Sequence, residues 1–188
     1  IKDSLQSLLG ASVFVTNGEE WKRQRRIIDP AFEGGRLREA FPAMVEAGNA
    51  AVQRLAAIAG NQPVEMEEEA SHLAADVIFR TLFSMPISSD IATEVFAEFR
   101  QYQRTQPLLN LASFIRLPRW MPKLHRRATR RSGRAIRRLL TELTTQRMAA
   151  IRRGDAPEDL ATKIMTTADP VTGETFSAAE MVDQVAIF

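Results

Sequence analysis

Apolar residues recur at spacings of three and four along nearly all of the 188-residue chain, which is the period of an α-helix buried on one face. No segment shows the sustained alternation typical of a half-buried strand, and no internal repeat is evident. The hydrophobic content of 45% is enough for one sizeable core. The sequence therefore predicts an all-α chain of several helices.

Proline, glycine and capping residues divide this pattern into separate helices. Asn17 and Glu20 have the spacing of a helix cap, and Ser177 with Glu180 repeats it as a capping box. Pro42 suits the first turn of a helix. We expect the second helix to bury Phe41, Met44, Val45, Val52, Leu55 and Ile58. The expected helices lie at about 19–29, 42–60, 65–84, 90–105, 122–153 and 157–166, and a last one begins after Ser177.

The residue composition argues against several kinds of site. The chain has no cysteine, so it offers no disulfide, thiolate metal site or cysteine nucleophile. Its two histidines, His72 and His125, are far apart and lack ligand-type partners at helical spacing, so we expect surface or core-edge residues and no metal site within this chain. No apolar run approaches membrane-spanning length and no signal-peptide pattern opens the chain, which favours a cytoplasmic protein.

An arginine-rich stretch between Lys123 and Arg138 contains no acidic residue, although the net charge is only +2. A basic helix can bind nucleic acid, so one hypothesis is an all-α nucleic-acid-binding regulator, and another is a helical scaffold without a ligand. The stretch has little aromatic interleaving and no helix-turn-helix spacing, which favours a solvated helix without nucleic acid. Its inward stripe is expected to comprise Leu124, Ile136, Leu139, Leu140 and Leu143.

Trp21 and Arg25 stand four residues apart on a predicted helix and therefore share a face. An indole N–H and a guanidinium are both pure hydrogen-bond donors, so the pair suits a carboxylate or a phosphate. The alternative is a stacked cation–π pair on the helix surface, which the spacing alone favours, because Trp and Arg four residues apart are a common coincidence.

The residues around this pair add a family resemblance. The string Asn17-Gly18-Glu19-Glu20-Trp21, followed by Arg25-Arg26 and by Pro30-Ala31-Phe32, resembles the C-helix segment of cytochromes P-450. In that family the Trp-x-x-x-Arg pair donates to the haem propionates, so the resemblance implies that role for Trp21 and Arg25. It also implies a parent fold that is mainly α with small β-sheets.

Two later segments extend the resemblance along most of the chain. Residues 117–122, followed by the arginine-rich helix, resemble the F–G connection and G helix, and residues 169–185 resemble the approach to the I helix. We therefore expect residues 1–188 to be part of a single cytochrome P-450 domain, truncated at both ends and similar to soluble bacterial members. The family's acid–Thr pair and cysteine ligand are expected beyond Phe188, so no catalytic residue is assigned within this chain.

The resemblance implies a haem b monooxygenase that inserts one atom of O₂ into an apolar substrate. Electrons would come from NAD(P)H through a ferredoxin or flavoprotein reductase. Lys22, Arg23 and Arg26 are then expected to form an exposed basic patch for the redox partner.

Two apolar segments are the expected contacts with a substrate. Val13 and Phe14 resemble residues that lean over the haem and line the substrate pocket, with plain loop packing as the alternative. Residues 108–121 resemble the lid over the substrate channel, and burial under neighbouring helices is the alternative.

Overall fold

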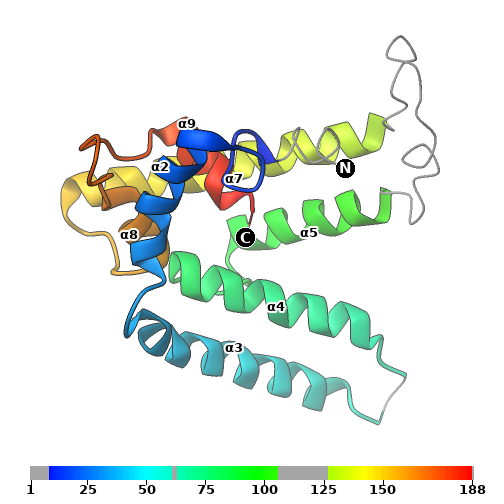
Figure 1. Ribbon diagram of the computed structural model, residues 1–188. Coiled ribbons are helices and arrows are strands. Elements are labelled where there is room, and N and C mark those ends of the chain that lie inside the picture. The colour runs from blue at the N-terminus through cyan, green and yellow to red at the C-terminus, as the bar shows by residue number, and fades with distance from the viewer. Residues whose placement is uncertain (1–8, 61–62, 106–126, 188) are drawn as a thin grey trace.

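The computed structural model describes residues 9–60, 63–105 and 127–187, which are helical apart from turns and connections. Four longer helices, α3 (Arg36–Ile58), α4 (Met66–Phe83), α5 (Asp90–Thr105) and α7 (Arg127–Arg153), lie side by side in chain order, and successive helices run antiparallel (Figure 1). The shorter helices α2 (Gly18–Ile28), α8 (Leu160–Thr166) and α9 (Ala178–Val185) gather around the left-hand part of α7 in Figure 1. The prediction of an all-α chain is confirmed for the described residues.

Most predicted helices lie where the periodicity placed them. α5 has the predicted bounds, and α4 and α2 differ from theirs by one residue at each end. α2 is followed by a single 3₁₀ turn at Asp29–Ala31, which accommodates Pro30. α7 extends to Arg153 as predicted, while the predicted start of this helix near residue 122 lies outside the described residues.

The helix caps decide two of the boundaries. The predicted capping box of α9 is present, because the Ser177 side chain accepts from the Glu180 amide and the Glu180 side chain accepts from the Ser177 amide. α8 begins at Leu160, later than predicted, because Asp159 acts as its N-cap and accepts from the Thr162 amide at 2.9 Å. Asn17 is the N-cap of α2 by position, but its side chain makes no capping hydrogen bond.

The prediction for α3 is partly wrong. The helix begins at Arg36 and carries Pro42 in its interior, so one proline was not enough to set its start. The buried residues are Ala47 and Ala51, whose small side chains leave room for α4 to pack closely. Of the predicted inner residues, Met44, Leu55 and Ile58 are half-buried, whereas the remaining three are exposed: Phe41, Val45 and Val52.

The core lies where α7 meets the other helices. The predicted inward stripe of α7 is confirmed, since Ile136, Leu139, Leu140 and Leu143 are all buried, while Leu124 lies outside the described residues. These side chains belong to one cluster with apolar residues of α2, α4, α5, α8 and α9. Among the described residues no helix is both long and apolar enough to cross a membrane.

The strongest polar contact of α2 joins it to the turn that precedes α9. Arg26 donates from Nε to Asp169 Oδ1 at 2.6 Å and from Nη2 to Asp169 Oδ2 at 2.9 Å. Asp169 is 0% exposed, and its remaining hydrogen bonds come from the Val171 amide and the Thr172 hydroxyl. The buried carboxylate is tolerated because the two hydrogen bonds from Arg26 replace the hydrogen bonds to water that burial removes.

A second arginine strengthens the same junction. Arg23 Nη1 lies 2.6 Å from Glu180 Oε1 at the start of α9, and Arg23 Nη2 donates to the Thr175 carbonyl. The same guanidinium lies over the Phe176 ring at 5.8 Å from its centroid. Arg23 and Arg26 therefore fix both the position of α2 and its rotation about its own axis.

The Arg26–Asp169 pair predicts a pH dependence of stability. The hydrogen bond from Arg26, with those from Val171 and Thr172, holds the pKa of Asp169 well below its usual range. A carboxyl whose folded-state pKa is depressed stabilises the fold above its unfolded pKa of about 4, and that contribution is lost as the pH falls below it. In the full-length protein, Asp169→Asn should lower the free energy of unfolding at pH 7, and the deficit should shrink as the pH falls to 3.

Urea denaturation of both proteins at several pH values measures this difference. Asp155→Asn is the matched control, because Asp155 pairs with Arg153 on the surface and both side chains are mostly exposed. It should change stability little at any pH. A deficit for Asp169→Asn that stays constant from pH 7 to pH 3 would contradict the assigned role of the pair.

Candidate functional site

The side chains of α2 divide into three sectors around the helix. Gln24, Ile27 and Ile28 are buried in the core. Arg23 and Arg26 occupy the second sector and bind acidic partners near α9. The third sector holds Trp21 and Arg25, the predicted carboxylate-binding pair. It faces outward because core packing and ion pairs occupy the other two sectors.

The predicted pair is brought together and exposed. Trp21 is 42% exposed, and the side chain of Arg25 is 48% exposed. The Arg25 guanidinium carbon lies 5.8 Å from the centre of the Trp21 ring, and Arg25 Nη2 lies 3.0 Å from Asp29 Oδ1. The structure thus contains the stacking contact named as the alternative, and it leaves both groups accessible to a further acceptor.

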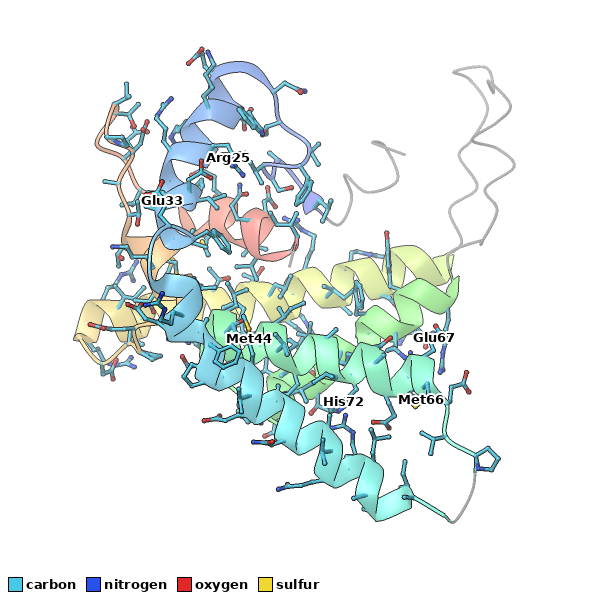
Figure 2. The ribbon with its side chains drawn as sticks, turned by 60° about the horizontal axis from the view of Figure 1, so that its bottom comes forward. Arg25, Glu33, Met44, Met66, Glu67 and His72 are labelled. Atoms are coloured by element: carbon cyan, nitrogen blue, oxygen red, sulfur yellow. The ribbon has the colours of Figure 1, made fainter. Side chains whose placement is uncertain are left out.

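Figure 2 shows that Arg25 lies on the opposite side of the molecule from Met66, Glu67 and His72 on α4. His72 is half-buried, and its ring meets Phe96 edge-on at 5.4 Å between centroids. Burial lowers its pKa from the ordinary value, an effect to which the nearby Arg54 adds. His72 is therefore a core-edge residue as predicted, and it plays no part at the Trp21–Arg25 face. His125 lies outside the described residues.

The predicted substrate-lining residues, Val13 and Phe14, lie in the turn before α2 and differ in environment. Val13 is half-buried and packs against the core cluster, whereas Phe14 is 74% exposed. The predicted lid at 108–121 lies outside the described residues.

Neither of two prominent hollows within the described residues is lined by Val13 or Phe14. One of about 250 Å³ is apolar and lies among α4, α5, α7 and the end of α9, with Phe79, Phe96 and Leu140 in its wall. The other, of about 420 Å³, is a polar cleft among α3, α4 and α8 that includes Arg80 and Lys163. Neither hollow includes Trp21 or Arg25.

The prediction of an exposed basic patch at Lys22, Arg23 and Arg26 is wrong. Arg26 is bound to the buried Asp169, and Arg23 to Glu180, while the exposed Lys22 pairs with Glu19 at 2.7 Å. The acids at 169 and 180 are more than 140 residues away in sequence, so only the fold brings them to α2. The burial of Gln24 was not predicted from the sequence, because its polar side chain does not mark it as a core residue.

Comparison with known proteins identifies the family. A family model described as cytochrome P450 matches residues 2–188. A cytokinin hydroxylase of Arabidopsis thaliana is 30% identical over 76% of this chain and 27% of its own length. A cyclooctat-9-en-7-ol 5-monooxygenase of Streptomyces melanosporofaciens is 30% identical over 99% of this chain and 39% of its own length. The chain thus spans well under half the length of these relatives.

The fold comparison agrees. The crystal structure of the cytochrome P450DA heme domain covers 98% of this chain with a TM-score of 0.72 at 20% sequence identity, and the chain spans 39% of it. A mutant of the same domain gives a TM-score of 0.76 at 23% identity. These likenesses concern the fold. The family match over residues 2–188 shows that the chain belongs to the cytochrome P450 family.

Proposed function

We propose that the full-length protein is a haem-dependent monooxygenase that inserts one oxygen atom from O₂ into an apolar organic substrate. In this proposal residues 1–188 are part of a single cytochrome P450 domain and supply one wall of the haem pocket. The observation that carries the proposal is the exposed donor pair, Trp21 and Arg25, on a helix whose other faces are held in place. Membership of the family supports the reaction type.

The donor pair fits a haem propionate. A propionate is a carboxylate, and both side chains can only donate hydrogen bonds. Within the described part of the chain, the Trp21 indole has no hydrogen-bond acceptor, and Arg25 makes only the half-exposed pair with Asp29 and the contact with Trp21. An exposed i,i+4 ion pair contributes about 0.3–0.5 kcal/mol, so exchanging Asp29 for a propionate costs little.

The residues of this chain would bind and orient the cofactor, which is haem b. When bound, haem supplies the O₂ chemistry, and its thiolate ligand must come from residues outside this cysteine-free sequence. Trp21 and Arg25 hold the propionates, and the Arg23 and Arg26 contacts keep that face of α2 in position. Val13 and Phe14 shape the wall of the pocket that receives an apolar substrate.

The proposal includes electrons from NAD(P)H, delivered by a ferredoxin or a flavoprotein reductase. The predicted basic patch does not support a docking surface for that partner, because all three of its cations are already paired with acidic residues. A cytoplasmic, bacterial origin also belongs to the proposal. The match to a Streptomyces relative over 99% of this chain supports it.

The alternative, a nucleic-acid-binding regulator, has no support from the comparisons. α7 buries its apolar stripe in the core, and its Arg137 pairs with Asp183 at 2.7 Å. A further arginine of this helix, Arg147, is buried and lies 2.9 Å from Asp159. The described arginines of α7 therefore serve partly to join it to α8 and α9.

Carbon monoxide binding tests the proposed function directly. Reduced full-length protein with carbon monoxide should show the red-shifted Soret band that thiolate ligation produces. A globin-like band in correctly folded protein, or a failure to bind haem at all, would overturn the proposal.

Substitutions at the donor pair should weaken haem retention in a defined order. Arg25→Ala removes a charge-assisted hydrogen bond, which is typically worth about 1.5–3 kcal/mol, so haem loss should be fastest in this variant. Arg25→Lys keeps the charge but loses the planar fork, and it should be milder. Trp21→Phe removes one donor and keeps most of the packing, so it should be the mildest. Transfer of haem to an acceptor protein measures the rates.

Two other arginines serve as comparisons. Arg138→Ala is the matched control, because Arg138 is an exposed arginine of α7. It should retain haem as the wild type does. Arg26→Ala should lower the stability of the whole fold, which urea denaturation separates from a direct effect on haem. If Arg138→Ala and Arg25→Ala lost haem equally fast, the assignment of Arg25 would be wrong.

A further inference from the structure

The loop of residues 10–16, which carries Val13 and Phe14, is bound by side chains of two different helices. Inside the loop, the Val15 and Thr16 amides donate to the Ser12 carbonyl at 2.8 and 3.0 Å, and this closes a tight turn. Further polar contacts of the loop backbone go to α9 and α2, and the Ser12 amide donates to the Leu9 carbonyl at 3.2 Å. Its shape therefore depends on where those two helices lie.

Two consecutive residues of α9 hold one side of the loop. Asp183 Oδ2 accepts from the Ala11 amide at 2.8 Å, and Gln184 Oε1 accepts from the Val13 amide at 3.1 Å. Gln184 is 0% exposed, so an apolar residue at 184 would leave the Val13 amide without its acceptor. Arg137 of α7 donates to the other carboxylate oxygen, Asp183 Oδ1, at 2.7 Å and so holds the carboxylate in place.

The approach at Asp183 is close enough to require glycine at position 10. Gly10 has φ +53°, a conformation that side-chain-bearing residues rarely adopt. A Cβ atom there would lie 2.1 Å from Asp183 Oδ1. The loop and α9 are therefore in direct contact at this point, and a displacement of α9 would move the loop.

A glutamine of α2 holds the other side. Gln24 Nε2 donates to the Ala11 carbonyl at 2.7 Å, and Gln24 Oε1 accepts from the Thr16 hydroxyl at 2.7 Å. Gln24 is almost fully buried and makes both bonds with one amide group. The amide and the carbonyl of Ala11 are thus held by different helices, α9 and α2.

We infer that Asp183, Gln184 and Gln24 are positioning residues that hold the 10–16 loop and thereby determine which apolar substrates the enzyme accepts. The inference rests on the proposed function, because it takes Phe14 as part of the substrate pocket. Phe14 itself is 74% exposed and packs on little, so its location is determined by the backbone on either side of it. The three side chains make that backbone rigid without touching a substrate themselves.

The test uses the full-length, haem-loaded protein with Gln184→Met, which keeps the length of the side chain and removes the acceptor. Gln53→Met is the matched control, because Gln53 is exposed in the middle of α3. Hydrogen exchange measures the loop directly. In Gln184→Met the Val13 amide should exchange roughly ten-fold or more faster, because it loses its acceptor, Gln184 Oε1. In Gln53→Met it should exchange at the wild-type rate.

Selectivity is read from two iron-binding probes, imidazole and 4-phenylimidazole, which differ only by an apolar ring. Optical titration gives both dissociation constants. In Gln184→Met their ratio should change by about three- to ten-fold, the size expected for one aromatic contact, while imidazole binding and haem retention stay at wild-type values. Gln53→Met should leave the ratio unchanged.

The possible results separate the two proposals. Faster exchange with an unchanged ratio of dissociation constants would overturn the selectivity role while the monooxygenase assignment stands. Unchanged exchange would overturn the positioning role itself. Absence of thiolate-ligated haem in the wild type would instead count against the proposed function. If Gln184→Met does not fold, Thr16→Val replaces it, because it removes the hydroxyl that binds Gln24 from a half-buried position, and an unchanged ratio of dissociation constants would then overturn the inference.

Discussion

The bidentate contact between Arg26 and the fully buried Asp169 is the interaction on which the candidate site depends. A carboxylate without solvent is costly unless it is paired, so the turn before α9 cannot move away from α2 without leaving Asp169 unsatisfied. Arg23 adds a second bond to the same junction through Glu180. Together these arginines prevent α2 from rotating, and this keeps Trp21 and Arg25 on the outer face.

α9 connects the two parts of the proposed pocket. Its first turn binds α2 through Glu180, and its last turn binds the 10–16 loop through Asp183 and Gln184. The helix that holds α2, and with it Trp21 and Arg25, is therefore also the helix that contacts the loop carrying Phe14. In the proposed enzyme, cofactor binding and substrate choice would share one rigid support, and the separate experiments on Arg25 and Gln184 address each role independently.

Features that depend on residues close together in the sequence could be predicted, whereas features that depend on contacts between distant residues could not. Helix positions were predicted well because apolar periodicity and caps such as the Ser177–Glu180 box act within a few residues. The inner face of α3 was predicted less well, because its exposed Phe41 and Val52 satisfy the same periodicity as core residues. Small alanines at the true contact with α4 carry little hydrophobic signal, so only the packing reveals them.

The sequence by itself determined the all-α architecture, the pairing of Trp21 with Arg25 on one face, and the resemblance to the family. Each of these rests on local spacing or on a short string of residues. Only the tertiary structure decided that Arg26 is structural and that Gln184 holds a loop 171 residues away. From the sequence alone, Arg26 cannot be distinguished from its neighbour Arg25, because charge does not indicate whether a side chain has an acidic partner. Its role depends on whether folding brings a buried carboxylate within hydrogen-bonding distance.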